Sequence, residues 1–141
     1  YVNNNYQNAT AGGVNANTNE VYGAITYGLF TAKYSHAISD LFGNPNSKNS
    51  YYVDLSAAFD LGDGYSLVPH VGYQKVKNTN PDASYTDYAL TLNKDIEGVV
   101  LSAALIGTNF KSRHGVDATL PGSGTKSLSG STLVLGLKKN F

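Results

Sequence analysis

The side chains that could do chemistry in this chain are three histidines and ten carboxylates, and there is no cysteine. His36, His70 and His114 have no metal-ligand spacing to one another, and no thiolate is present to complete a zinc site. His70 stands between Ser66 and Gln74 in an alternating segment, so a Ser/His/acid site is conceivable there. A single histidine in a strand is more often a polar wall group. We expect no metal, no cofactor and no enzymatic activity.

Charged residues form a second candidate set, because they alternate with apolar residues along their segments. Rings of charge set ion selectivity where they line a pore. The other interpretation is a solvated wall, or ion pairs that brace it. The residues of this set are Glu20, Lys33, Asp54, Asp60, Asp87, Asp95 and Lys138.

Composition indicates which elements position these side chains. The 141 residues include 11 Tyr and 15 Gly, and only 14% of them are charged, against a usual quarter. This favours Tyr-rich and Gly-rich β-structure. Ten basic residues balance ten acidic residues, so nucleic acid is not an expected partner. No stretch reaches the ~18 to 20 apolar residues of a transmembrane helix, which excludes a helical membrane protein.

Seven segments have strand character. Most of them are longer than the ~5 to 6 residues of an average globular strand. They match the ~9 to 11 residues that a tilted strand needs to cross a bilayer. The segments are 20–28, 29–38, 50–61, 65–76, 84–96, 98–110 and 131–141.

Short and long connections alternate between these segments. The short ones are Gly28-Leu29, residues 62–64 and Glu97-Gly98, and each is a tight hairpin signal. The long polar ones are residues 39–50, 77–84 and 111–130. Outer-membrane barrels have this asymmetry, with short periplasmic turns and long external loops.

The chain therefore divides into two parts. Residues 1–19 are rich in Asn, Gly and Thr and are expected to form an external loop, with Tyr1-Val2 as the candidate end of a preceding strand. Residues 20–141 are expected to form the strands of a single domain.

Alternation assigns the strand residues to two faces. One face is apolar. The other face is polar, and in a barrel it would line the lumen, whereas in a soluble sandwich it would face water and the apolar face would be the core. Alternation alone does not separate these architectures. The residues expected to line a lumen are Lys33, Asp54, His70, Gln74, Asp87, Thr91 and Asn93.

Aromatic residues of the apolar face gather near both ends of the segments. Two aromatic girdles around an aliphatic band are typical of strands that cross two membrane interfaces. The alternative is the general preference of Tyr for strands. With strand length and loop alternation, the pattern favours a membrane barrel. The girdle residues are Tyr27, Phe30, Phe59 and Tyr65 near the short turns, and Tyr34, Tyr51, Tyr73 and Tyr88 towards the long loops.

Several stretches together resemble one family. TNEVYGAITYGLFTAKYSHAISDLFGN, YTDYALTLNKDIEGVVLSAALIGTNF and the closing LVLGLKKNF resemble the C-terminal half of the TorF-like family of Gram-negative outer-membrane proteins, which are often described as porins. The resemblance covers about residues 18–141. It implies an all-β antiparallel transmembrane barrel of about twelve strands, about five of them upstream of the seven seen here.

The resemblance also implies how the chain reaches its place. Leu135, Leu137 and Phe141 fit the C-terminal signal that barrel assembly machinery recognises in its clients. The expected location is the bacterial outer membrane. The expected partners are outer-membrane lipid, the assembly machinery, and a protein partner or a second copy of the chain.

Two functions follow as expectations. The leading one is a passive channel for small polar solutes or ions, which would diffuse along the polar face. The alternative is a non-conducting barrel that acts as a binding or structural partner through its long external loops, above all residues 111–130.

Overall fold

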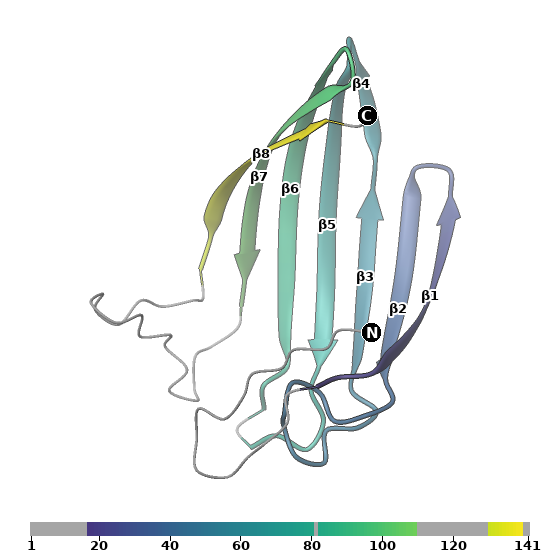
Figure 1. The fold of residues 1–141 in the computed structure, drawn as a ribbon, viewed down its shortest axis with the longest axis vertical. Coiled ribbons are helices and arrows are strands. Elements are labelled where there is room, and N and C mark those ends of the chain that lie inside the picture. Colours follow the sequence, from purple (N-terminus) through teal and green to yellow (C-terminus); the bar gives the residue numbers. More distant parts are fainter. Residues whose placement is uncertain (1–16, 81, 110–129, 140–141) are drawn as a thin grey trace, which may run out of the picture.

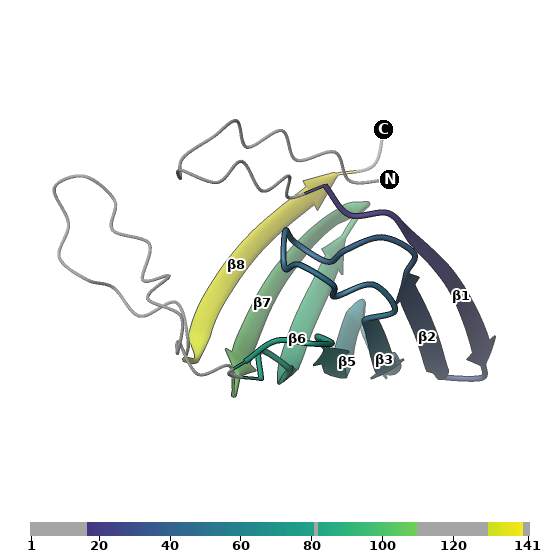
Figure 2. The same ribbon diagram turned by 90° about the horizontal axis from the view of Figure 1, so that it is seen from below.

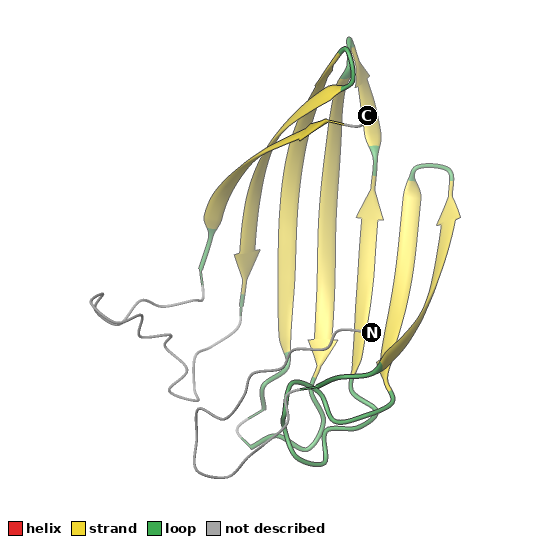
Figure 3. Ribbon diagram, in the orientation of Figure 1, coloured by secondary structure: helices red, strands yellow, loops and turns green. Residues whose placement is uncertain are grey.

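The computed structural model describes residues 17–80, 82–109 and 130–139, and every regular element in them is a β-strand (Figure 3). No helix in this part of the chain is long and apolar enough to span a membrane. The prediction of an all-β antiparallel fold is confirmed. The strands are β1 (Glu20–Tyr27), β2 (Phe30–Ala37), β3 (Tyr51–Ala57), β4 (Phe59–Gly62), β5 (Tyr65–Lys75), β6 (Tyr85–Ile96), β7 (Val99–Thr108) and β8 (Thr132–Lys139).

The strands form one sheet in which chain neighbours pair. The order is β1-β2-β3-β5-β6-β7-β8, with β4 paired to β5, and every pairing is antiparallel. Figure 1 shows this meander, and Figure 2 shows that the sheet curves into an arc. Within the described ranges β1 pairs only with β2 and β8 only with β7, so the arc is open.

The segment predicted as one strand over 50–61 is two strands. β3 pairs with both β2 and β5, whereas β4 pairs with β5 alone. The break is at Ala58, whose backbone N–H donates to the carbonyl of Leu29 in the β1–β2 turn at 2.9 Å. The physical reason is that β2 begins at Phe30, opposite Ala57, so the strand has no partner on that side beyond this point. The described sheet therefore has eight strands, and the prediction of seven is corrected.

The short turns gather at one end of the sheet and the long connections at the other, as predicted (Figure 1). The β6–β7 turn has a positive φ at both central residues, Glu97 (53°) and Gly98 (85°). Asp63 (50°) and Gly64 (76°), between β4 and β5, also have a positive φ. Two-residue type I′ turns require this backbone, and its twist matches that of the strands. Of the predicted connection 111–130, only Gly130 lies inside the described ranges.

Gly64 is the turn glycine that should tolerate replacement least. Its φ is +76°, and a Cβ there would lie 2.7 Å from the backbone oxygen of Asp95. We expect Gly64→Ala to lower the free energy of unfolding by at least ~1 to 2 kcal/mol, through left-handed strain and the clash. Gly23→Ala is the matched control, because nothing lies within 4 Å of a Cβ at that strand position. Denaturant unfolding of both variants under the same conditions checks this, and equal losses would contradict it.

Few apolar side chains are buried in the described sheet. Ala37, Leu41 and Val76 form a small cluster with Ala83 beside it, at the end with the long connections. The large apolar residues of the strands are mostly exposed, with Leu135 at 75% and Leu137 at 73%. The apolar face thus has no second layer among the described residues.

Asp82 links the end of β5 to the residue that precedes β6. Asp82 accepts hydrogen bonds from the Ser84 hydroxyl at 2.6 Å and from the Ser84 backbone N–H at 3.0 Å. Lys75 Nζ lies 3.0 Å from its other oxygen. The bonds from Ser84, together with Lys75, lower the pKa of Asp82 to about 2. The carboxylate therefore keeps these bonds in all but strongly acidic solution.

Candidate functional site

Strand register places all seven predicted lumen residues on one face. Lys33 pairs with Asp54, Asp54 with Gly72, and Gly72 with Asp87, so one row crosses four strands. His70, Gln74, Thr91 and Asn93 lie an even number of residues from this row and share its face. The connection 38–50 lies on the inner side of the arc in Figure 2, and its Phe42 lines a hollow with Lys33 and Tyr52. We call this polar side the concave face.

A cluster of four side chains occupies the middle of the concave face. His70 Nε2 lies 2.6 Å from Asp54 Oδ2, and His70 Nδ1 lies 3.6 Å from Asp87 Oδ1. The Tyr52 hydroxyl donates to the two oxygens of Asp87 at 3.0 and 3.1 Å. It also lies 3.4 Å from His70 Nε2. The three titratable side chains joined by the ion pairs are 22 to 23% exposed, so solvent reaches all of them.

Gly72 makes room for this cluster. A Cβ at Gly72 would lie 1.9 Å from the Tyr52 hydroxyl and 2.8 Å from Asp87 Oδ2. The missing side chain is what lets Tyr52 reach across β5 to Asp87. Sequence analysis did not select Tyr52 or Gly72, although both alternate with residues that it did select. The sequence feature that could have identified Tyr52 was its position two residues before Asp54, on the same polar face.

The Ser/His/acid site considered from the sequence is not assembled by Ser66 and His70. Ser66, the serine considered with His70, receives a hydrogen bond from Asn93 Nδ2 at 3.2 Å, and no bond joins it to His70. In the part of the chain that the structure describes, no group of three His, Asp or Glu side chains is placed to hold a metal ion. The arrangement is a solvent-accessible polar cluster whose carboxylates and imidazole can bind ions or polar groups.

Two of the candidate carboxylates brace turns. Asp60 Oδ1 accepts from the Gly62 backbone N–H at 2.9 Å, and Asp95 Oδ1 accepts from the Gly98 backbone N–H at 2.9 Å. Both lie at the end with the short turns. Asp60 and Asp95 therefore brace short turns through backbone hydrogen bonds and not through ion pairs, whereas Asp54 and Asp87 lie beside His70 on the concave face.

The eight predicted girdle residues all lie on the opposite, convex face. Tyr34 and Tyr51 have ring centroids 5.9 Å apart, and those of Tyr51 and Tyr73 are 6.4 Å apart. Tyr88 covers Gly107, where a Cβ would lie 2.5 Å from the ring. The packed rings form a belt next to the long connections. Its role at a membrane interface stays a prediction.

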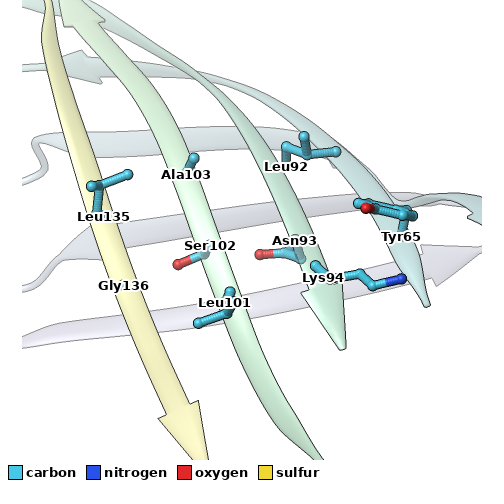
Figure 4. Close-up of a pocket in the computed structure, with 9 residues that line it drawn as sticks. All are labelled: Tyr65, Leu92, Asn93, Lys94, Leu101, Ser102, Ala103, Leu135 and Gly136. Carbon is cyan, nitrogen blue, oxygen red and sulfur yellow. The ribbon is translucent and has the colours of Figure 1, made fainter. Parts of the chain in front are cut away.

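A second hollow, of about 320 Å³, lies over β6, β7 and β8 near the short turns (Figure 4). The small Ala103 stands there between Leu92 and Leu135 in register. Beside it, Lys94 Nζ lies 4.0 Å from the centroid of the Tyr65 ring. Leu135 and Leu137 of the predicted insertion signal are on this apolar side, and Phe141 lies outside the described residues.

The chain is thus an all-β protein whose open, curved antiparallel sheet has a charged concave face and an apolar convex face. It belongs to the family described as "Bacterial protein of unknown function (Gcw_chp)", whose model matches residues 1–141. No curated protein and no solved structure shows significant similarity to this chain.

Proposed function

We propose that this chain forms part of an outer-membrane β-barrel that acts as a passive channel for small polar solutes or ions. The observation that carries the proposal is that one curved sheet has an apolar convex face and a charged concave face. The convex face exposes leucine and aromatic side chains with nothing over them in the described structure. The concave face presents the Asp54, His70 and Asp87 cluster to solvent.

Lipid is the cover that best fits the convex face. Exposed apolar area this continuous marks a surface that binds something apolar. β5, β6 and β7 contain 11, 12 and 10 residues, close to the ~9 to 11 that span a bilayer. Tyr65 and Tyr73 lie near the two ends of β5, which fits the two interfaces.

Barrel closure supplies the missing neighbours of β1 and β8. An open sheet edge within hydrocarbon leaves backbone groups without hydrogen bonds, which costs several kcal/mol for each group. Further strands must therefore pair with these edges. The resemblance to the TorF-like family implies about twelve strands in all, with short turns in the periplasm and long loops outside. Leu135, Leu137 and Phe141 would form the signal that the assembly machinery recognises.

Conductance of the full-length protein in a planar bilayer tests the channel. We expect stable current steps with a preference for cations, because Asp54 and Asp87 place negative charge on the lumen wall. The double variant Asp54→Asn/Asp87→Asn should lose most of that preference while it still conducts. The reversal potential in a salt gradient measures the change.

The control for charge is Asp63→Asn, which makes the same change in an exposed short turn outside the concave face. It should leave the reversal potential as in the wild type. Silence from a correctly folded, heat-modifiable barrel would rule out the channel.

The second candidate is a non-conducting barrel that binds a partner through its external loops. The observation in its favour is the folded connection 38–50, which lies over the concave side of the sheet (Figure 2). A barrel with no current that loses a bound partner when residues 112–129 are deleted would support this candidate.

A further inference from the structure

A hollow of about 440 Å³ lies between the connection 38–50 and the concave face. Its walls come from β1, which contributes Glu20, and from β2, β3, β5 and β6, and Phe42 of the connection contributes to its rim. A cavity of this size is in the range of small-molecule sites. Its lining includes Lys33, Ser35, Phe42, Tyr52, Gln74 and Asp87.

The roof of this hollow is a folded segment. Leu41 and Ser47 are both fully buried, and the Leu41 backbone N–H donates to Ser47 Oγ at 2.7 Å. The Asp40 carboxylate accepts the backbone N–H groups of Asn46 at 3.2 Å and Lys48 at 3.0 Å. These bonds close the connection upon itself, so its shape is set by its own residues.

The roof is also tied to its neighbours. The Phe42 backbone N–H donates to Thr18 Oγ1 at 2.9 Å, and Asn78 Nδ2 donates to the Asn46 carbonyl at 2.7 Å. The φ of Phe42 is +50°. An aromatic residue in this left-handed region is uncommon, and such conformations persist where the surrounding structure holds them. Phe42 is therefore held in place at the hollow.

The wall presents two nearly buried polar side chains to the hollow. Gln74 is 4% exposed, and its Nε2 donates to the carbonyls of Tyr51 at 3.0 Å and Lys75 at 3.2 Å. Its Oε1 is an acceptor, and the hydroxyl of Ser35, which is 7% exposed, both donates and accepts. A solute in the hollow can bond to both.

Opposite charges stand on two sides of the hollow. Lys33 has no carboxylate within ion-pair distance among the described residues, and its Nζ lies 4.5 Å from the centroid of the Tyr22 ring. Asp87 stands in the same register row, separated from Lys33 by Asp54 and Gly72. Glu20 also lines the hollow with Lys33 and Asp87. A solute that carries both charges is complementary to this pattern, and a simple anion meets the repulsion of the two carboxylates.

We propose that this hollow binds small zwitterionic solutes of the amino-acid type. The solute carboxylate bonds to Lys33 and to the Ser35 hydroxyl, and its ammonium group bonds to Asp87 and to Gln74 Oε1. Phe42 packs on the aliphatic part and limits its size. This assignment rests on the proposed channel and names its solute class.

The test is block of single-channel current in the full-length protein by serine, which carries both charges. Acetate carries only the anion and glycinamide only the cation, and both serve as probes. We expect serine to reduce the current at concentrations at which acetate and glycinamide do not. Lys33→Gln should raise the half-blocking concentration at least about tenfold, since a hydrogen bond to a charged group is lost. Phe42→Ala should admit phenylalanine, which the wild type excludes.

Lys77→Gln is the control, since it removes an exposed lysine outside the hollow. It should leave the block by serine unchanged. Equal block by all three probes, or block that Lys33→Gln does not weaken, would overturn the zwitterion assignment and leave the channel standing. If the wild type carries no current, the channel fails, and calorimetric titration of the folded protein with serine decides the binding site: heat that Lys33→Gln abolishes supports it, and no heat overturns it.

Discussion

A Leu90→Arg variant should lose about 2 to 4 kcal/mol of its free energy of unfolding in lipid vesicles, the cost of an arginine on the lipid face at mid-membrane. Leu90 lies in the middle of β6 on the convex face and is 47% exposed. Without a bilayer, an arginine at such an exposed position would cost little. A large loss therefore reports the medium that covers this face. Denaturant titration of the protein inserted in vesicles measures it.

Thr91→Arg is the matched control for this loss. It introduces the same side chain at the next position of the same strand, but on the concave face, and should cost much less. Ile96→Arg tests whether the cost of the arginine depends on its depth in the bilayer. Ile96 ends β6 beside a short turn, and near a membrane interface the cost in free energy of unfolding should fall to about 0 to 1 kcal/mol. Equal losses at all three positions would contradict a convex face covered by lipid. A wild type that stays monodisperse without detergent would favour the soluble sandwich, in which the apolar face is the core.

Leu41→Ala should release the roof over the concave face. Leu41 is fully buried against Ala37 and Val76, and a Leu→Ala change at such a site costs about 2 to 5 kcal/mol. Because the cluster lies at one end of the sheet, the loss should fall mainly on local opening of residues 38–50. Amide hydrogen exchange in this segment should accelerate at least about thirtyfold, while the strands exchange as in the wild type.

Phe42→Ala is the control that distinguishes loss of buried packing from truncation of any apolar side chain in the same connection. Phe42 is the next residue but is 59% exposed, so its truncation should leave the protection of residues 38–50 nearly unchanged. A connection that exchanges equally fast in the wild type and in Leu41→Ala would show that the roof is open in solution.

The strands and their two faces could be predicted because period-2 alternation and glycine turns are local signals. The break at Ala58 could not, because it depends on where β2 begins, which is a property of the neighbouring strand. Tyr52 was missed for a similar reason. Its bond to Asp87 crosses β5 through the gap at Gly72, and such a contact needs the register of three strands.

The folded connection 38–50 was also missed. Its polar composition indicated a loop in solvent, and the apolar pair Leu41-Phe42 was the one sign of a packed segment. In the structure Leu41 anchors the connection and Phe42 faces the hollow. An apolar pair inside a polar connection therefore indicates a connection that packs over the end of a curved sheet.

The early end of the β1–β2 hairpin bears on the outline of the sheet at the end with the short turns. β3 loses its neighbour at Ala57, while β4 carries the chain on to Gly62, so one edge of β4 has no strand beside it among the described residues. In a closed barrel the radius depends on the number of strands and on the shear, which is the register offset accumulated around the sheet and not the length of any one hairpin. An insertion that lengthened β1 and β2 to match β4 would keep the present register, so it would fill this notch and leave the radius unchanged.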